Sequence, residues 1–405
     1  MYYGWLIVAG AFIAQFFVTG FYTYGFPVLA KVVKKEFNVS AADVMEATLY
    51  TVLLGLIVAP IVGYLADKWS ARKLVCIGSI CLGAGLIFLS EAKNIFEFVV
   101  IFAIFLCLAN NLLGPATSST LVSRWFSTSR GKALGVAAIG TSIGGILIPL
   151  YIAWGIGPSD DWRKMLFDLG VFILVFLPIF LYFVLRDYPS DLGLVGEPQA
   201  AESLEINENQ INDPDLTIKD ILCSKPFWLL GVTLGLLFSS QSAVLANIGI
   251  HFDNINMGDQ AKNFIMTLAV MGFLGKLAFG YAADRINLKV GLSIAIVLAM
   301  CGVLILASQS PSIPIKSAAI FLGLATGGML PVWGAMIAAI FGVKSYGRVM
   351  GAMSPLIALL VMPGPILCGW LFDIYGNYSN SFYLFTSVLG ASLLILFLLK
   401  VERIS

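Results

Sequence analysis

Long runs of apolar residues alternate with short polar stretches from one end of the chain to the other. A helix that crosses the hydrocarbon core of a bilayer needs about 20 mostly apolar residues, and the 405 residues contain twelve runs of this kind. They lie at roughly 5–30, 44–66, 74–90, 97–122, 131–156, 165–186, 226–250, 262–283, 290–309, 315–341, 348–372 and 380–399. The pattern predicts an all-α membrane protein with twelve transmembrane helices.

The connections between these runs are short, with one exception after the sixth run. Residues 187–225 hold nine acidic residues against two lysines and show almost no apolar periodicity, which is typical of a solvated segment. The sequence therefore predicts an N-terminal six-helix bundle at 1–186, a cytoplasmic acidic linker at 187–225 and a C-terminal six-helix bundle at 226–405. Within the linker, PDLTIKDIL at 214–222 predicts a short helix along the membrane surface.

The two halves carry the same motifs at almost the same spacing. GYLADKW at 63–69 recurs as GYAADRI at 280–286. WFSTSRGKALG at 125–135 matches IFGVKSYGRVMG at 340–351, and its glycines are shifted along the chain by almost the same amount as the first motif. A repeat of six spans in the same sense implies two bundles related by an axis along the membrane normal.

The composition and charge of the chain argue against several classes of protein. The chain is 59% hydrophobic and 12% charged, far from the composition of a soluble domain. Its net charge of +1 argues against a nucleic-acid partner. Six scattered cysteines without a CxxC pair, and a single histidine, argue against disulfides and a metal site. Without a phosphate-binding loop motif, nothing suggests an ATP-driven pump. We expect no cofactor, no metal and no nucleic acid.

Lysines and arginines are more numerous in the loops on the side of the termini than in the loops on the other side. This bias predicts that both termini are cytoplasmic. The start, MYYGWLIVAGAF, has no basic region before its apolar run and is interpreted as a retained first span. A bacterial inner (plasma) membrane is the expected location, and a monomer in the lipid bilayer is the expected state.

At the repeated motifs the sequence resembles the major facilitator superfamily. GYLADKWSARK is similar to the signature loop between spans two and three of that family, and the resemblance covers the whole chain. Three further stretches, YYGW, SRWFSTSRGKALG and GKLAFGYAAD, are similar to its oxalate/formate antiporter and monocarboxylate transporter branch. The resemblance implies the major facilitator fold and secondary active transport by alternating access, and it argues against an enzyme.

The signature loops also predict residues for gating. Gly63 should let two helices approach, while Asp67 and Arg72 should make charge contacts at helix ends, and Asp284 and Arg285 repeat the pattern. In the family such contacts hold the halves together when the site faces outward. The alternative is that these charges only anchor the loops and set the topology.

Span eleven contains a second candidate for gating. Pro363 and Pro365 each remove a backbone donor and should kink this span. A kinked helix can flex during transport, although a static kink is equally compatible with the sequence.

Lys276 is the main candidate for substrate binding. It lies eight residues before Asp284, which places it about 12 Å inside at ~1.5 Å per residue, near the middle of a ~30 Å hydrocarbon layer. A charged lysine facing lipid at that depth costs at least about 2.5 kcal/mol. No Asp or Glu lies deep in another span. We therefore expect Lys276 to face a central cavity and bind an anion, with a structural charge pair as the alternative.

The family comparison sharpens this expectation. In oxalate and monocarboxylate transporters an arginine in this stretch of span eight binds the substrate carboxylate, and Lys276 occupies that position. Other charged positions of these relatives correspond to Val28, Ile265 and, by an uncertain alignment, the neighbourhood of Met353. With one positive charge, the resemblance implies a monoanion, or a larger molecule with one anionic group, rather than a dicarboxylate.

Polar residues in spans one, four, seven and ten are candidates for the remaining substrate contacts, because these spans surround the cavity in this fold. From a wider set that includes Thr326 of span ten, the first choices are Tyr22, Asn111, Gln241, Asn247 and Trp333. The alternative is that polar groups of this kind only bond across membrane helices for packing. His251, near the outer end of span seven, is interpreted as surface or loop-facing rather than as a proton carrier.

These features predict a secondary active transporter for a small organic anion, with a monocarboxylate as the first choice, as exchanger or symporter. The expected partners are this substrate and a coupling proton or counter-anion. One alternative is export or import of a larger molecule such as a siderophore or drug. An alternative of another class is a membrane receptor or scaffold that does not transport.

Overall fold

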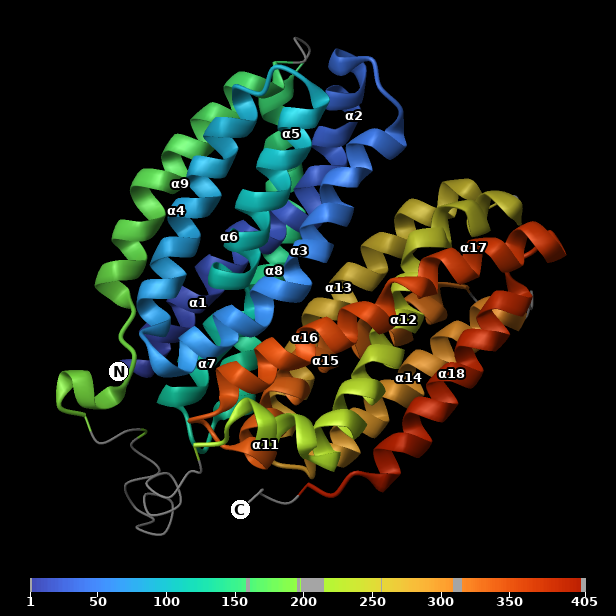
Figure 1. Ribbon diagram of the computed structural model, residues 1–405. Coiled ribbons are helices and arrows are strands. Elements are labelled where there is room, and N and C mark those ends of the chain that lie inside the picture. The colour runs from blue at the N-terminus through green and yellow to red at the C-terminus, as the bar shows by residue number, and fades with distance from the viewer. Residues whose placement is uncertain are drawn as a thin grey trace. The chain divides into compact units, whose positions relative to one another are not determined.

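The structure, a computed structural model, describes residues 2–157, 161–194, 197, 215–255, 257–308 and 315–401. Helices make up its regular structure, and no strand occurs in these ranges. In chain order the elements are α1 (Gly4–Thr19), η1 (Gly20–Gly25), α2 (Phe26–Phe37), α3 (Ala41–Lys68), α4 (Ala71–Ser90), α5 (Ile95–Ile101), η2 (Phe102–Leu106), α6 (Cys107–Leu113), α7 (Pro115–Trp125), α8 (Arg130–Ile156), α9 (Trp162–Val184), η3 (Pro189–Leu192), α11 (Ile218–Cys223), α12 (Lys225–Asn254), α13 (Gly258–Ala283), α14 (Leu288–Ser308), α15 (Ile315–Phe341), α16 (Tyr346–Val361), α17 (Pro363–Tyr375) and α18 (Ser379–Leu398) (Figure 1).

Within the described ranges, twelve helical segments are long and apolar enough to cross a bilayer, which confirms the predicted number of spans. Nine of them are built from one helix each, since three are composite. The first combines α1, η1 and α2, the fourth runs from α5 to α7, and the eleventh combines α16 and α17. Apolar runs of this length form helices in lipid because a helix satisfies its own backbone hydrogen bonds.

The linker contributes two short elements. Its predicted helix corresponds to α11, where Thr217 and Asp220 form a capping box around the first turn. The turn η3 follows α9 and ends at Gly193, whose φ of 68° suits a residue without a Cβ. The rest of the predicted linker, at 195–196 and 198–214, lies outside the described residues.

The chain packs as two compact units. Unit 1 contains Met1–Thr128, Val136–Asp213 and Val343–Ala352. Unit 2 contains Ser129–Gly135, Pro214–Gly342 and Met353–Ser405. Each unit therefore includes a short segment from the part of the sequence that otherwise belongs to the other unit.

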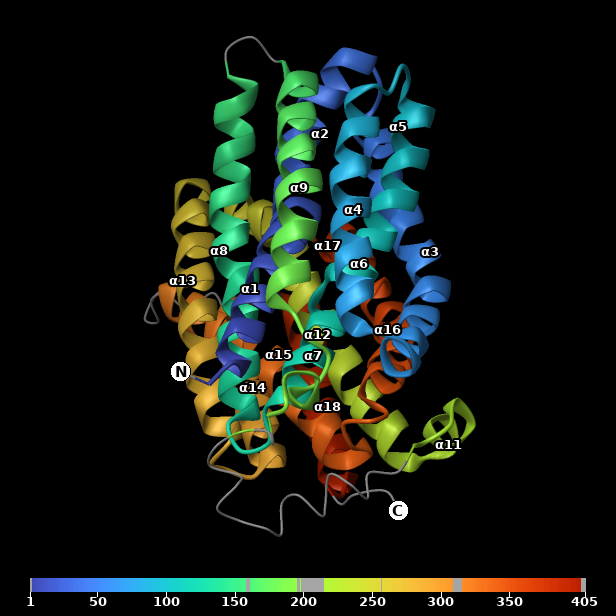
Figure 2. The same ribbon diagram turned by 90° about the vertical axis from the view of Figure 1, so that its left-hand side faces the viewer.

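In unit 1, small residues let helices pack backbone to backbone. Helices α4 and α9 lie side by side (Figures 1 and 2). A Cβ on Gly83 of α4 would lie 2.6 Å from the backbone nitrogen of Leu174 in α9. Gly144 of α8 also packs closely on α1, since a Cβ there would lie 2.9 Å from the carbonyl carbon of Phe16. Such contacts supply the packing that holds helices together where lipid provides no hydrophobic drive.

In unit 2, helices α13 and α15 make the most extensive contact. A Cβ on Gly275 would lie 2.6 Å from the carbonyl oxygen of Leu324. A Cβ on Gly323 would lie 2.6 Å from the carbonyl oxygen of Leu268. Glycines on both partners thus fix the register of the two helices, and this register positions the candidate site.

Candidate functional site

Lys276 lies on α13 with only 7% of its surface exposed. Its backbone is held on two sides. A Cβ on Gly327 of α15 would lie 2.7 Å from the Lys276 nitrogen, and a Cβ on Gly135, which also belongs to unit 2, would lie 2.6 Å from the Lys276 carbonyl oxygen. The lysine is therefore a buried cation on a closely packed helix pair.

Gln241 on α12 faces α15 at the same level. Its Oε1 accepts a hydrogen bond of 2.7 Å from Thr326 Oγ1. Because Thr326 is adjacent to Gly327, this bond lies one residue from the point where α15 meets Lys276. The Gln241 side chain is 5% exposed, and its Nε2 has no hydrogen-bond partner within the described part of the chain.

Trp333 lies two turns beyond Thr326 on α15, on the same helix face. Its ring packs edge-on against Phe238 of α12, with the centroids 6.1 Å apart. Trp333 is 8% exposed, and no residue that the structure describes accepts a hydrogen bond from its Nε1. We call the contact made by Phe238, Gln241, Thr326 and Trp333 the α12–α15 seam.

Of the five polar residues predicted beside Lys276, only Gln241 and Trp333 lie in this seam. Asn247 is also on α12, but its Nδ2 donates to Ala243 O at 2.9 Å and to Pro365 O at 3.3 Å. Its Oδ1 accepts from the hydroxyl of Tyr378 at 3.3 Å. The Asn247 amide thus joins α12 to α17 and to the start of α18, as a packing group does.

The two remaining candidates lie in unit 1. Asn111 on α6 donates from Nδ2 to the backbone oxygen of Cys107 at 2.8 Å. Tyr22 lies in η1, and its ring centroid is 6.1 Å from that of Phe102 in η2. The η1 and η2 segments are π-helical, and such turns are rare and concentrate at functional sites. The sequence pattern did not predict them.

His251 corrects one interpretation of the sequence. It was predicted to be surface or loop-facing, yet it is 0% exposed on α12. The rings of Phe252, Tyr378 and Phe382 surround it, the last with centroids 5.0 Å apart. The prediction used only the position of His251 along its span, and it could not anticipate that aromatic residues at the start of α18 would cover the imidazole.

Asp67 lies at the end of α3 and receives the first turn of α16. Its Oδ1 accepts from the Gly347 backbone nitrogen and its Oδ2 from that of Arg348, both at 2.8 Å. The Arg348 guanidinium adds an ion pair of 3.1 Å, and the Asp67 side chain is 0% exposed. Gly63 makes this approach possible, since a Cβ there would lie 2.8 Å from the Cα of Gly351.

Asp284 repeats this arrangement in unit 2. It follows α13, and its carboxylate accepts from the backbone nitrogens of Gly131 at 2.5 Å and Lys132 at 2.8 Å, in the first turn of α8. A carboxylate is favoured there because the N-terminus of a helix carries unpaired N–H groups and positive dipole charge. Arg285 stacks on the ring of Tyr281 at 4.2 Å.

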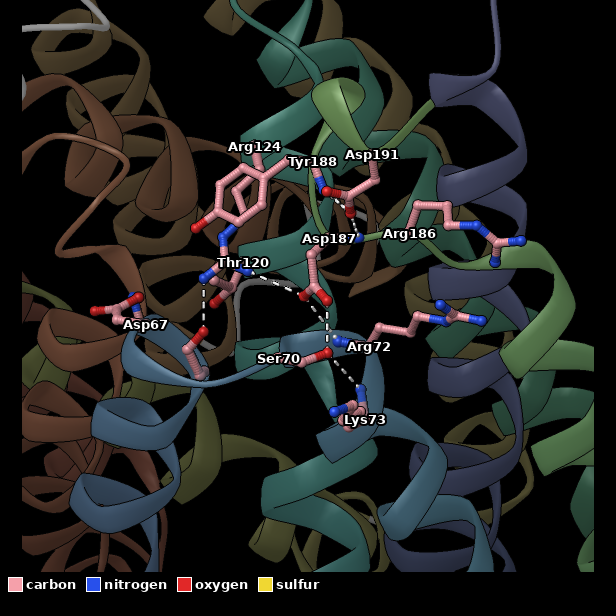
Figure 3. Close-up of polar contacts among 12 residues, drawn as sticks. Asp67, Ser70, Arg72, Lys73, Thr120, Arg124, Arg186, Asp187, Tyr188 and Asp191 are labelled. Carbon is pink, nitrogen blue, oxygen red and sulfur yellow. Dashed lines mark hydrogen bonds and ion pairs between the residues drawn. The ribbon is translucent and has the colours of Figure 1, made fainter. Parts of the chain in front are cut away.

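Arg72 contacts α9 rather than α3. Its guanidinium stacks on the Tyr182 ring at 4.2 Å and donates to the Tyr182 backbone oxygen. Asp187, just after α9, organises this region (Figure 3). It accepts from Ser70 Oγ at 2.5 Å, from the Arg72 backbone nitrogen at 3.1 Å and from the Arg124 guanidinium at 3.3 Å. The charge contact of Arg72 therefore fastens α4 to α9.

Pro363 and Pro365 coincide with an interruption of span eleven. Helix α16 ends at Val361, and α17 begins at Pro363. The carbonyl oxygen of Pro365 is one of the acceptors of Asn247. A Cβ on Gly364, between the prolines, would lie 2.8 Å from the backbone oxygen of Ser239 on α12. The interruption thus lies where α17 packs closely on α12.

Two residues of these networks, Arg348 and Asp187, were given no role by the sequence, and a third, Thr326, was one of the wider set of polar residues in span ten. Arg348 could have been found from the repeat, because it corresponds to Lys132 when the matching glycines of the two halves are aligned. Asp187 is one of nine acids in the linker, and nothing in its local sequence distinguishes it. Thr326 becomes notable only through its bond to Gln241.

Comparison with known proteins supplies the family. The model of the Major Facilitator Superfamily matches residues 11–315 and 253–404. Human monocarboxylate transporter 11 is 22% identical over 400 residues, covering 96% of this chain and 81% of that protein. The agnestins efflux protein AgnL12 of Paecilomyces divaricatus is 22% identical over 407 residues, covering 98% and 88%.

A solved structure agrees with the fold. The proton:xylose symporter XylE bound to 6-bromo-6-deoxy-D-glucose superposes with a TM-score of 0.77 at 13% sequence identity, covering 99% of this chain and 97% of that one. At that identity the likeness concerns the fold alone. Together with the twelve apolar spans and the family match, it confirms the predicted fold: the chain is a multi-pass integral membrane protein of the Major Facilitator Superfamily.

Proposed function

We propose that this protein is a secondary active transporter for a small organic anion and that Lys276 binds the anionic group. The observation that carries the proposal is a lysine with 7% exposure deep in an apolar span. A charge at such depth is costly, and it is retained mainly at ion and substrate pathways. The seam beside it adds two buried N–H donors, on Gln241 and Trp333.

A monocarboxylate is the substrate class that fits this charge. A lysine ammonium is a point charge with three donors, so it satisfies one carboxylate without the paired geometry of an arginine. Human monocarboxylate transporter 11, among the relatives, supports the same class by its name. The coupling partner, a proton or a counter-anion, stays a prediction, as do the monomer, the bacterial inner membrane and the cytoplasmic termini.

One alternative also has support. AgnL12 is named as an efflux protein, and it matches 98% of this chain, against 96% for human monocarboxylate transporter 11. Export of a larger molecule with one anionic group would use the same lysine. A receptor or scaffold would transport nothing, so any measurable transport would exclude that alternative.

The test is uptake of labelled monocarboxylates and dicarboxylates into proteoliposomes by the parent and by Lys276→Ala. A hydrogen bond to a charged group contributes about 1.5–3 kcal/mol, so we expect Lys276→Ala to lower uptake at subsaturating substrate about 10- to 100-fold. Lys276→Arg should retain part of the uptake because it keeps the charge. Lys316→Ala is the matched control, since Lys316 is an exposed lysine at the start of α15.

Two results would contradict the proposal. Uptake by Lys276→Ala at the parent rate, with Lys316→Ala equally active, would show that the cation does not bind the substrate. Absence of any carboxylate uptake by the well-folded parent would shift the assignment to the efflux alternative or to a protein that does not transport.

A further inference from the structure

The α12–α15 seam contains an imbalance between donors and acceptors. Gln241 Oε1, the acceptor of its amide, is used by Thr326, whereas Gln241 Nε2 and Trp333 Nε1 have no partner among the residues described. A buried donor without a partner loses the hydrogen bonds that water would provide, so each such group calls for an explanation. Here both unpaired groups donate, and Lys276, whose backbone packs against Gly327 next to Thr326, adds a positive charge on the adjoining helix. The seam therefore suits a ligand that brings only acceptors.

The two donors lie at different levels. Gln241 meets α15 at Thr326, next to Gly327, where the Lys276 backbone packs. Trp333 follows Thr326 by seven residues, which corresponds to about 10 Å along a helix. A carboxylate bound beside Lys276 and Gln241 would therefore lie about two helical turns from the Trp333 backbone, which leaves Trp333 Nε1 to a second acceptor on the ligand.

The stretch between the two levels is apolar. Met329, on α15 between Thr326 and Trp333, is 0% exposed, and the Phe238 ring packs on the Trp333 indole. A ligand that extends from one level to the other would contact hydrocarbon and aromatic surface along its middle. Aromatic side chains in such a position favour a flat or apolar ligand body.

From these observations we infer that the substrate is an elongated monocarboxylate with an apolar or aromatic body and a second hydrogen-bond acceptor at the end far from its carboxylate. Gln241 binds the carboxylate together with Lys276, and Trp333 Nε1 donates to the distal acceptor. This inference rests on the proposed function, and it adds a specificity determinant that selects against two- and three-carbon acids.

Two synthetic acids of equal size test the distal subsite. The acid 4-(4-acetylphenyl)butanoate carries a ketone oxygen at the far end of its ring, and 4-(4-ethylphenyl)butanoate lacks that oxygen. Because a buried donor without an acceptor is costly, we expect the parent in proteoliposomes to take up the acetyl acid with a KM about tenfold lower. Pyruvate, which is too short to reach Trp333, should be transported less efficiently than either acid.

Variants assign the effect to residues. Trp333→Phe keeps an aromatic ring without the N–H, so it should make the KM values of the two aromatic acids equal. Gln241→Met keeps the length of the side chain without the amide, so it should raise both KM values while preserving their ratio. Trp154→Phe is the matched control, since Trp154 is 78% exposed on α8, and it should keep the parent values.

The outcomes separate this inference from the proposed function. If Lys276→Ala loses uptake of all carboxylates while Trp333→Phe still prefers the acetyl acid, the anion site stands and the Trp333 subsite is overturned. A parent that takes up pyruvate better than both aromatic acids also overturns the elongated substrate. If Lys276→Ala transports every acid as the parent does, the proposed function itself fails.

Discussion

At the scale of the residue, Tyr2 shows how burial near the start of the chain changes a side chain. Its hydroxyl donates to the backbone oxygen of Trp125 at 2.5 Å, and its ring packs edge-on against Phe126 with centroids 5.5 Å apart. Burial, with the nearby charge of Glu197, raises the pKa of Tyr2 from 10.0 to about 12. Glu197 is itself bound to the backbone nitrogens of Ser127 and Thr128.

This environment predicts a loss of stability in alkali. Because the folded state raises the pKa of Tyr2, the stabilisation is complete below pH 10 and is lost as the pH rises toward about 12. Melting temperatures in detergent should therefore fall more steeply over this range for the parent than for Tyr2→Phe. Tyr375→Phe, at an exposed tyrosine, is the control and should follow the parent. Parallel curves for parent and Tyr2→Phe would contradict the prediction.

Single residues were predictable from sequence where their chemistry conflicts with their surroundings. Lys276 is conspicuous because a cation in an apolar run has few explanations. Gln241 and Trp333 were named by residue type and span alone, whereas their unpaired donors became visible only with the partners in place. Asn247 carries the same type of amide in the same helix, and its neighbours use that amide for packing. Sequence alone could not separate these cases.

At the scale of the element, length and hydropathy predicted the spans but not their interruptions. The breaks at η1 and η2 replace one turn of α-helix by a wider turn within continuous apolar runs. Hydrophobic periodicity does not report such a local change, because it registers only which residues are apolar. Span eleven was an exception, since two prolines close together, each without a backbone donor, predicted its interruption, whereas the single prolines Pro149 and Pro331 lie inside continuous helices.

Helix contacts that depend on glycine should be sensitive to one methyl group. In Gly63→Ala the new Cβ would meet backbone atoms of Gly351, which cannot rotate away. We expect a loss of about 1–3 kcal/mol of stability, as for other overpacked sites, seen as a lower melting temperature. In Gly249→Ala, within α12, the Cβ would meet nothing within 4 Å, so the variant should gain about 0.5–1 kcal/mol from helix propensity. Equal melting temperatures for Gly63→Ala and Gly249→Ala would contradict the close contact between Gly63 and Gly351.

At the scale of the whole molecule, the internal repeat predicted where equivalent contacts occur. Asp67 and Asp284 occupy matching positions of the two halves, and so do their backbone partners Gly347 and Gly131. The correspondence could be read from the sequence because both motifs are conspicuous. Which motif binds which was not readable, since it depends on packing between segments far apart in the chain.

The Asp67 contact should contribute more to the stability of the protein than the matching Asp284 contact. Asp67 forms a buried ion pair with Arg348, whereas Asp284 is exposed. Removing one partner of a buried pair costs about 3–5 kcal/mol, while an exposed charged contact contributes about 1 kcal/mol or less. Asp67→Asn should therefore lower the melting temperature much more than Asp284→Asn, and Asp168→Asn, at an exposed acid of α9, should have no effect. Equal losses from Asp67→Asn and Asp284→Asn would refute the distinction.

The membership of Val343–Ala352 in unit 1 has a consequence for biosynthesis. A ribosome releases the first six spans long before it makes this segment, and domains fold in the order of synthesis. Until Arg348 is synthesised, the Asp67 carboxylate lacks its ion-pair partner at the end of α3. Unit 1 is thus completed late in synthesis: its first six spans expressed alone would lack the segment Val343–Ala352, and co-expression with the remaining spans would supply it.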